Sequence, residues 1–210
     1  MPPEPDLRGP PLALHAVGVA GSGMAGLAAI LQAMGHRVSG SDQQVPPGHR
    51  AENVPPDVAA VIVSAAVRPD NPAVQEARRR GLPVWKYAEA VGRLMAGARG
   101  VAVAGPHGKT TTTAAIAFVL RSAGWDPSFL IGGAVPQLGG SAGFGHGEVF
   151  VVEACEYDRS FLNYRPEVAV VTNIDADHLD YYKDLEEIDQ AFRRFASGSG
   201  YVVGCGDDPR

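Results

Sequence analysis

The 210-residue chain is 45% hydrophobic with a net charge of −5, which suits a globular fold and excludes the basic surface of a nucleic-acid-binding protein. Its two cysteines, Cys155 and Cys205, lie far apart and fit neither a disulfide framework nor a CxxC metal site. No window approaches the ~20 apolar residues of a membrane span, and residues 1–14 lack the apolar core of a signal peptide. We therefore expect a soluble protein of the reducing cytoplasm.

The first half of the chain alternates strands with helices. An apolar run at residues 12–20 predicts a buried strand, and glycines and then apolar residues at helical spacing from Met24 to Met34 follow it. Further strands are expected at 36–41 and 58–64, and a helix at 72–80. This alternation predicts an α/β class with a doubly wound parallel sheet. Small residues at 95–100 precede a restart of the pattern, so we place a domain boundary near Ala98, between domains at 1–98 and 99–210.

The second half repeats the strand, glycine loop and helix order. The sequence predicts strands at 101–104, 128–131, 149–153, 168–172 and 201–204, and a helix at 110–122. A second, amphipathic helix is indicated by apolar residues at helical spacing, namely Leu185, Ile188, Phe192 and Phe195. Because the chain stops just after a strand, we expect it to be the front part of a longer protein.

The first glycine loop has the GxGxxG pattern at Gly21-Ser22-Gly23-Met24-Ala25-Gly26, between an expected strand and helix. Asp42 follows about twenty residues later, at the end of the next strand. In dinucleotide sites such glycines let the backbone approach a diphosphate, and the acid binds a ribose hydroxyl. Either NAD or a UDP-sugar fits this pattern, and a glycine turn needed only for packing is the structural alternative.

The second glycine loop, Gly105-Pro106-His107-Gly108-Lys109-Thr110, follows a strand and opens a helix. In a phosphate-binding loop, backbone N–H groups cradle phosphates, Lys109 reaches the β- and γ-phosphates, and the Thr110 hydroxyl ligates Mg²⁺. Val103 stands where the full pattern has its first glycine, so this is a shortened variant. Four threonines in the first turn, Thr110 to Thr113, are poor helix formers and suggest that hydroxyls are required there; an ordinary glycine turn is the alternative.

Polar residues end two later strands. Glu153 closes the strand at 149–153, and Asn173 and His178 follow the strand at 168–172. Because carboxyl ends of parallel strands share one edge of a sheet, Glu153 is a candidate Mg²⁺ ligand, although a solvated strand end would also explain it. His178 is a weaker candidate, since Mg²⁺ prefers oxygen. Capping of the next helix is an alternative role for the nearby aspartates Asp175, Asp177 and Asp180.

Six segments, in this order, carry a family resemblance over residues 12–209: HAVGVAGSGMAGLA, VSGSD, GHRAENV, GPHGKTTTTA, EACEYDRSFL and TNIDADHLDYY. Together they resemble the Mur ligases, and among these the members that add L-alanine to UDP-N-acetylmuramate. The resemblance implies a three-domain, ATP-dependent amide-forming ligase of peptidoglycan precursor synthesis. In such an enzyme ATP phosphorylates the lactyl carboxylate, and the amine of L-alanine attacks the acyl phosphate. This chain would hold the first domain and the front of the second, and would complete no turnover alone.

The resemblance also implies roles for individual residues. Lys109 would steady the transferred phosphate, Thr110 and Glu153 would hold one Mg²⁺, His178 would hold a second, and Asn173 would assist at the phosphates. The implied ATP-binding residues are Gly105, Pro106, His107, Gly108, Lys109, Thr110 and Thr111. The implied UDP-sugar-binding residues are Gly21, Ser22, Gly23, Met24, Asp42, His49 and Ser64.

Three departures from the family pattern stand out. Pro106 replaces the usual threonine of the loop, Cys155 replaces an aspartate, and only residues 43–47 separate Asp42 from Gly48. Three alternatives remain open: a ligase that joins a recycled tripeptide to the same UDP-sugar, an NAD-dependent oxidoreductase resting on the first loop, and a non-catalytic nucleotide-binding module. The spacing between EYDRSFL and TNIDADH favours the alanine ligase over the tripeptide ligase.

Overall fold

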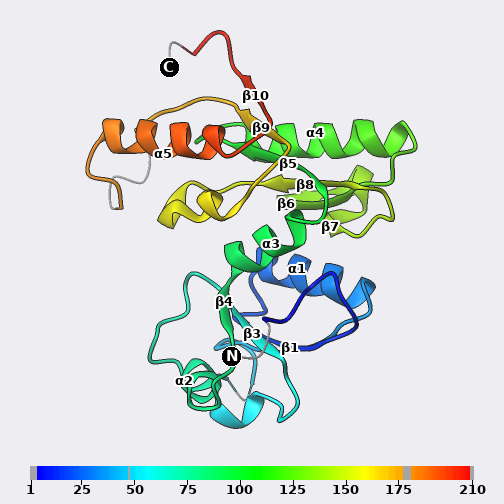
Figure 1. Ribbon diagram of the computed structural model, residues 1–210, viewed down its shortest axis with the longest axis vertical. Helices are drawn as coiled ribbons and strands as arrows, with labels where there is room; N and C mark the ends of the chain where they lie inside the picture. Colours follow the sequence, from blue (N-terminus) through cyan, green and yellow to red (C-terminus); the bar gives the residue numbers. More distant parts are fainter. Residues whose placement is uncertain (1–3, 47, 177–180, 209–210) are drawn as a thin grey trace. The chain divides into compact units, whose positions relative to one another are not determined.

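A computed structural model of the chain describes residues 4–46, 48–176 and 181–208. The chain forms two compact units, Met1–Leu94 and Met95–Arg210, each of which has its own sheet (Figure 1). Across the described ranges, every helix is too short or too polar to cross a bilayer.

The first unit is built on a four-stranded parallel sheet. Its strands are β1 (Ala13–Val17), β2 (Arg37–Ser41), β3 (Ala60–Val63) and β4 (Val84–Lys86), in the order β2-β1-β3-β4. The helices are α1 (Ser22–Ala33), α2 (Pro72–Arg79) and α3 (Tyr87–Met95), with a 3-10 turn η1 at Ala51–Asn53. The predicted parallel α/β sheet is confirmed, and β4 and α3 are additions to the predicted elements.

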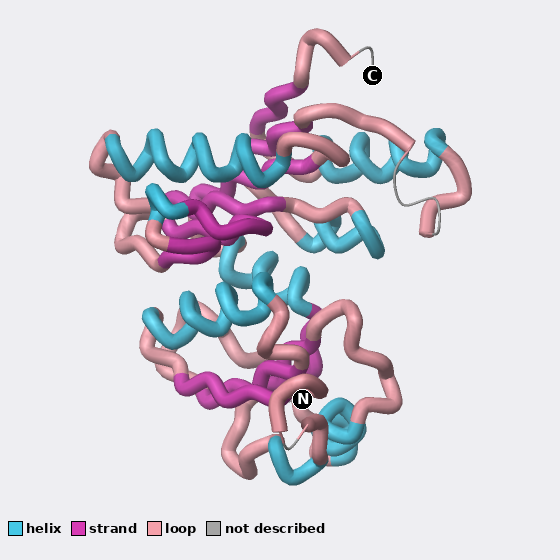
Figure 2. The backbone as a smooth tube through the Cα atoms, turned by 180° about the vertical axis from the view of Figure 1, so that it is seen from behind, coloured by secondary structure: helices cyan, strands magenta, loops and turns pink. Residues whose placement is uncertain are grey.

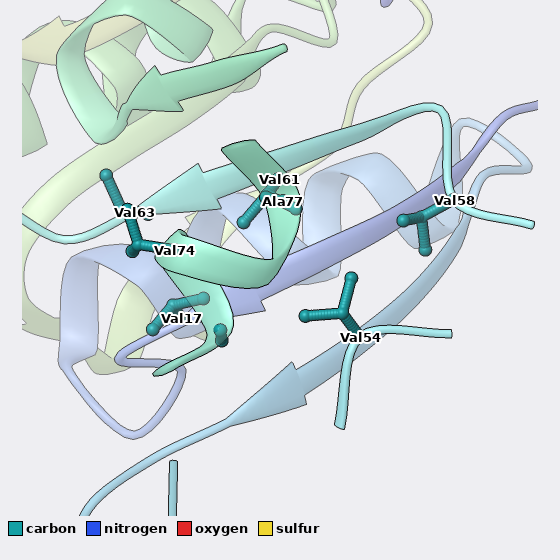
Figure 3. Packing of buried hydrophobic residues seen from close by; sticks show 8 residues of the cluster. Val17, Val54, Val58, Val61, Val63, Val74 and Ala77 are labelled. Atoms are coloured by element: carbon teal, nitrogen blue, oxygen red, sulfur yellow. The ribbon is translucent and has the colours of Figure 1, made fainter. Parts of the chain in front are cut away.

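Valine side chains fill one side of the first unit's sheet. Val17, Val61 and Val63 project from β1 and β3 onto Val74 and Ala77 of α2 (Figure 3). Helix α2 begins where the Asn71 side chain accepts a hydrogen bond from the Ala73 N–H at 2.9 Å, and Pro72 supplies a preset helical φ. The cap and the valine cluster together fix α2 against the sheet.

The second unit is built on a six-stranded, mostly parallel sheet. The strands are β5 (Arg99–Ala104), β6 (Ser128–Val135), β7 (Gly140–Gly143), β8 (Val149–Glu153), β9 (Val168–Val171) and β10 (Tyr201–Gly204). Their order is β10-β9-β5-β8-β6-β7, with β7 alone antiparallel to its neighbour. All predicted strands are present, and the antiparallel β7 was not predicted.

The second unit has two long helices, α4 (Lys109–Ser122), which packs against strands β5, β6 and β8, and α5 (Leu185–Ser197) (Figures 1 and 2). Short 3-10 segments η2 (Pro136–Leu138) and η3 (Tyr157–Asn163) connect the strands. On α5, Ile188, Phe192 and Phe195 are buried, as the predicted amphipathic pattern requires. The ring of Phe161 in η3 lies 5.1 Å from that of Phe192 and 4.9 Å from that of Phe195, so α5 and η3 pack through aromatic contacts.

In each sheet, the first strand of the unit lies between two strands that come later in the sequence. In the first unit β1 lies between β2 and β3, and in the second β5 lies between β8 and β9. Ligands of open parallel sheets bind where the strand order reverses, outside the carboxyl ends of the strands. The loops that follow β1 and β5 are the two glycine loops, so each lies at such a position in its own unit.

Candidate active site

The second glycine loop, residues 105–108, connects β5 directly to α4. Gly105 has φ +128° and Gly108 has φ +82°, conformations that favour glycine. A Cβ on Gly105 would collide with the Thr172 Oγ1 and lie 2.7 Å from the Asn173 backbone oxygen. The first turn of α4 contains no acidic residue, so its unpaired N–H groups form a site suited to phosphate oxygens.

Lys109 is the first residue of α4, and its ammonium group is held at the loop. Its Nζ lies 2.7 Å from the Gly105 carbonyl oxygen and 3.0 Å from each carboxylate oxygen of Glu156. The Lys109 side chain is 14% exposed and that of Glu156 only 2%. Both charges are therefore largely removed from water, and each compensates the other.

Thr110 and Glu153 meet beside the loop. The Thr110 hydroxyl donates to Glu153 Oε2 at 3.0 Å, and the Gly132 N–H donates to the same oxygen at 2.7 Å. A hydroxyl and a carboxylate are hard oxygen donors, and Mg²⁺ in nucleotide sites is commonly held by one or two such groups together with phosphate oxygens and waters. In the described part of the chain no three His, Cys, Asp or Glu side chains converge. Thr110 and Glu153 together fit a nucleotide-bound Mg²⁺.

The end of β9 fastens the loop from its other side. Asn173 Oδ1 accepts from the His107 N–H at 3.1 Å, and its Nδ2 donates to the His107 carbonyl at 2.9 Å. The Thr172 hydroxyl lies 2.7 Å from that same carbonyl oxygen. Three bonds on His107 fix the backbone next to Pro106, which has no N–H of its own. Asn173 is thus at the loop, and its amide engages the loop itself.

A second layer of contacts supports Glu156. The Tyr182 hydroxyl donates to the Glu156 backbone oxygen at 2.6 Å, and burial raises the pKa of Tyr182 to about 12. The Arg159 guanidinium pairs with Glu187 and lies 5.8 Å from the centre of the Tyr182 ring. The Cys155 side chain is exposed, and partial desolvation of its thiol beside the loop raises the pKa of that thiol. These contacts tie Glu156 to the start of α5.

Sequence patterns had not assigned a role to Glu156, Thr172 or Tyr182. The one signal for Glu156 was its position three residues after Glu153 in EACE. His178, together with Asp177 and Asp180, lies outside the described residues. Lys109, Thr110, Glu153, Asn173 and the loop, in contrast, are brought together at one sheet edge.

The first unit has a cleft of about 940 Å³ at the carboxyl ends of β1, β2 and β3. Asp42 lies at its edge: Oδ2 accepts from the Ala20 N–H at 3.0 Å and Oδ1 from the Gln44 N–H at 2.9 Å. These two backbone bonds hold the pKa of Asp42 below its usual range. Asp42 therefore carries its charge at the cleft and braces the first glycine loop.

The predicted UDP-sugar residues fall into two groups. Gly21, Asp42, His49 and Ser64 line the cleft. Ser22, Gly23 and Met24 form the first turn of α1, and the Met24 side chain is buried, which leaves its backbone as the part a ligand could reach. Gly18 also lines the cleft and has φ +85°, and a Cβ there would lie 2.9 Å from the Ser64 Cβ. The sharp turn after β1 therefore begins three residues before the GxGxxG pattern.

Comparison with protein families gives two matches that together cover almost the whole chain. The model of the Mur ligase family, catalytic domain, matches residues 13–99, and that of the Mur ligase middle domain matches residues 103–210. The division between the two matches falls close to the division between the two compact units.

Individual relatives extend this comparison. The UDP-N-acetylmuramate–L-alanine ligase of Carboxydothermus hydrogenoformans is 48% identical over 94% of this chain and 46% of its own length. That of Aquifex aeolicus is 44% identical over 93% of this chain and 46% of its own length. The chain spans about half the length of the curated relatives it matches.

Two solved structures resemble the fold closely. The UDP-N-acetylmuramate-alanine ligase of Thermotoga maritima matches with a TM-score of 0.85 and 30% identity, over 94% of this chain and 50% of that one. The UDP-N-acetylmuramate:L-alanyl-gamma-D-glutamyl-meso-diaminopimelate ligase of Neisseria meningitides matches with a TM-score of 0.84 and 28% identity, over 95% of this chain and 73% of that one.

Proposed function

Since the chain belongs to the Mur ligase family, we propose that it supplies the UDP-sugar-binding and ATP-binding parts of a ligase that joins L-alanine to UDP-N-acetylmuramate. The observation that carries this proposal is the meeting of Lys109, Thr110 and Glu153 at one phosphate-binding loop. The relatives named for the alanine reaction, 42–48% identical to this chain, support the choice of substrates.

Each domain has its own task in this proposal. Residues 1–98 bind the UDP-sugar in the cleft beside the first glycine loop, where Gly21, Asp42, His49 and Ser64 line the walls. The N-terminus of α1 contributes no acidic residue, which suits a diphosphate. Residues 99–210 bind ATP at the second loop, through residues 105–111.

The reaction begins with a carboxylate. A carboxylate is a poor electrophile, because attack on its carbon would have to expel an oxide or hydroxide ion. Transfer of the γ-phosphoryl group of ATP to the lactyl carboxylate of UDP-N-acetylmuramate makes an acyl phosphate and releases ADP. The amine of L-alanine then attacks the acyl carbon, the C–N bond forms as the amine loses a proton, and inorganic phosphate leaves. Catalysis of this kind depends on positioning and charge stabilisation.

The residues at the second loop are suited to those tasks. The Lys109 ammonium stabilises charge on the transferred phosphoryl group, and Asn173 holds the loop in place through His107. Thr110 and Glu153 would hold Mg²⁺, which neutralises phosphate charge during transfer. For Lys109 to reach a phosphate, the ligand has to share or replace the bonds that Glu156 now makes. His178 is proposed as a ligand of a second Mg²⁺ on the family resemblance.

We place the reaction in the cytoplasm, in peptidoglycan precursor synthesis. ATP and UDP-sugars are cytoplasmic substrates, and the cysteine usage of the sequence suits a reducing compartment. Neither the net charge of −5 nor the described helices suggest a nucleic-acid or membrane partner.

A tripeptide ligase acting on the same UDP-sugar is the second candidate, because the Neisseria structure matches almost as well as the Thermotoga one. The identity to the alanine enzymes favours L-alanine. An amide-forming assay of the intact gene product with ATP and either L-alanine or the tripeptide separates these two candidates, and turnover with the tripeptide alone would reverse the choice.

The direct test for this chain is calorimetric titration with UDP-N-acetylmuramate, ATP with Mg²⁺, and NAD in turn. We expect binding of the first two and none of NAD. Lys109→Met should remove ATP binding and leave UDP-N-acetylmuramate binding intact, because Lys109 lies only in the second unit. Binding of NAD without UDP-N-acetylmuramate would instead support an oxidoreductase.

A further inference from the structure

His15 is a fully buried histidine in the middle of β1, with 0% exposure. In the parallel pairing of β1 with β2 it lies opposite Ser39. Its Nδ1 is 2.9 Å from the Ser39 Oγ, and its Nε2 is 3.3 Å from the Ser41 Oγ. Both ring nitrogens of a buried imidazole are therefore paired with hydroxyls of one neighbouring strand.

The contacts continue from the core to the cleft. The Ser41 Oγ also lies 3.2 Å from Nδ1 of His49, and His49 lines the cleft of the first unit. Ser41 itself is 5% exposed. A row of hydrogen-bonded side chains thus runs from Ser39 through His15 and Ser41 to His49. Of these four residues, His49 alone lines the cleft.

The direction of each hydrogen bond in this row of side chains follows from the number of hydrogens that each hydroxyl and ring can donate. The Ser39 hydroxyl donates to the Leu14 carbonyl at 3.2 Å, and a hydroxyl has one hydrogen to donate. Ser39 must therefore accept from His15, which places a proton on Nδ1 of His15. Burial lowers the pKa of His15 to about 4, so the ring is neutral and its Nε2 is an acceptor.

The same counting carries over to His49. The Ser41 hydroxyl donates its one hydrogen to Nε2 of His15, so toward His49 it can only accept. Nδ1 of His49 must then carry a proton. The reverse direction would leave the bond from Ser39 to the Leu14 carbonyl unmade. Within the described residues, Nε2 of His49 has no hydrogen-bonding partner.

We propose that His15 and Ser41 are positioning residues that keep the proton of His49 on Nδ1, so that Nε2 is free to accept a hydrogen bond from a donor group of the bound nucleoside diphosphate sugar. The ligand class rests on the proposed function, whereas the tautomer rests on the hydrogen bonds alone. Such an acceptor recognises a ligand N–H or hydroxyl, whereas the other tautomer of the ring would present an N–H donor at that position.

A second buried histidine supplies an internal standard. Nδ1 of His36 accepts from the Leu12 N–H at 3.0 Å, so its proton must lie on Nε2, which is 2.8 Å from the Leu7 carbonyl. His36 is 5% exposed. One unit therefore holds histidines of opposite tautomer, and a single spectrum can compare them.

The test is long-range ¹H–¹⁵N NMR of the full chain with ¹⁵N-labelled histidine at about pH 8, with signals assigned by single His→Gln variants. We expect the Nδ1–H pattern for His15 and His49 and the Nε2–H pattern for His36. Ser41→Ala should convert His49 toward the Nε2–H pattern, and Ser41→Thr, which keeps the hydroxyl, should preserve the wild-type pattern. An Nε2–H pattern for wild-type His49, or an unchanged His49 in Ser41→Ala, would overturn the proposal.

Calorimetry with uridine diphosphate and with UDP-N-acetylmuramate gives the functional readout. Ser41→Ala should weaken binding of the UDP-sugar by about tenfold, the effect of one lost hydrogen bond, with Ser41→Thr and the second-unit variant Ser199→Ala unchanged. Equal affinity in Ser41→Ala and wild type would refute the link to binding. If wild type binds neither ligand, the proposed function fails, while the NMR pattern still decides the tautomer.

Discussion

The two glycine loops of this chain share a backbone plan and differ in charge. Each follows a central parallel strand, β1 or β5, and opens a helix, α1 or α4, whose first turn has no acidic residue. The second loop adds Lys109, paired with the buried Glu156, and the Thr110–Glu153 contact. The first loop has no cationic side chain between Gly18 and Gly26, and its nearby Asp42 is satisfied by backbone N–H groups.

This difference indicates a division of labour. Backbone N–H groups and a helix dipole are enough to bind a diphosphate that stays intact. A phosphoryl group that changes partners needs charges placed where negative charge develops. The first loop is therefore suited to holding a substrate and the second to transferring phosphate. Each prediction below tests one side of this contrast, from the largest expected effect to the smallest.

The largest effect is expected from breaking the buried ion pair of the second loop. Lys109→Met removes the cation that pairs with the 2% exposed Glu156 carboxylate, and loss of one partner of a buried pair costs about 3 to 5 kcal/mol. We expect the free energy of unfolding, measured by urea denaturation, to fall by about 3 kcal/mol. Adding Glu156→Gln in the double variant should restore part of that loss.

The matched control is a surface pair in the same unit. Arg99 and Glu167 are 50% and 35% exposed, and such pairs contribute less than about 1 kcal/mol. Glu167→Gln should therefore be nearly neutral. If Lys109→Met were no more destabilising than Glu167→Gln, the ion pair would not be the structural basis of the second loop.

The next prediction concerns the loss of stability of the first unit at acidic pH. Burial lowers the pKa of His15 from its ordinary 6.5 to about 4. As pH falls through this window the unfolded chain binds a proton and the folded chain does not, so stability is lost, by roughly 3 kcal/mol in full. Hydrogen exchange at pH 7 and pH 4.5 should show greater loosening of β1 than of β5. In His15→Gln that pH-dependent difference should shrink, and its persistence would assign the acid sensitivity to other groups.

The sequence predicts those elements whose local composition determines them, and it misses those that depend on tertiary contacts. The apolar run of β8 was predicted with the bounds that the structure shows, Val149–Glu153, because a continuous run of apolar residues is typical of a buried strand. Strand β7, Gly140–Gly143, was not, because GSAG has little strand propensity and pairs with β6 through tertiary context. Strand β4 has only three residues, too few for a periodic signal.

The contacts in the two candidate sites were likewise predictable only in part. The positions of Glu153 and Asn173 beside the loop follow from the rule that carboxyl ends of parallel strands share an edge. The Glu156 contact with Lys109 does not follow from that rule, because it depends on the turn after β8, where Asp158 and Arg159 adopt φ +52° and +53°. Left-handed conformations of such residues are uncommon and have no simple sequence signature. Likewise, the bonds of His15 required the register of β1 with β2.

A third prediction tests the backbone of the second loop. Gly105→Ala forces an alanine to φ +128° and brings its Cβ against Thr172 and Asn173, and we expect a loss of about 2 kcal/mol in the free energy of unfolding together with weaker ATP binding. Gly124→Ala is the control, since Gly124 has φ +81° with nothing within 4 Å of a Cβ. It should cost about 1 kcal/mol and leave ATP binding unchanged. Equal losses in the two variants would show that the close approach to β9 is unimportant.

The smallest expected effect concerns the Thr110 hydroxyl, which we propose as a Mg²⁺ ligand at the second loop. Thr110→Ala removes the oxygen that lies 3.0 Å from Glu153 Oε2, and we expect Mg²⁺-dependent ATP binding to weaken about tenfold, because one oxygen ligand is lost. Thr110→Ser keeps the hydroxyl and should retain affinity, and Ser122→Ala, which removes a hydroxyl at the far end of α4, should match wild type. The informative comparison is calorimetry of ATP with and without Mg²⁺. If Thr110→Ala weakened binding equally in both conditions, the hydroxyl would serve the phosphates or the loop rather than the metal, and the contrast between the two loops would rest on Lys109 alone.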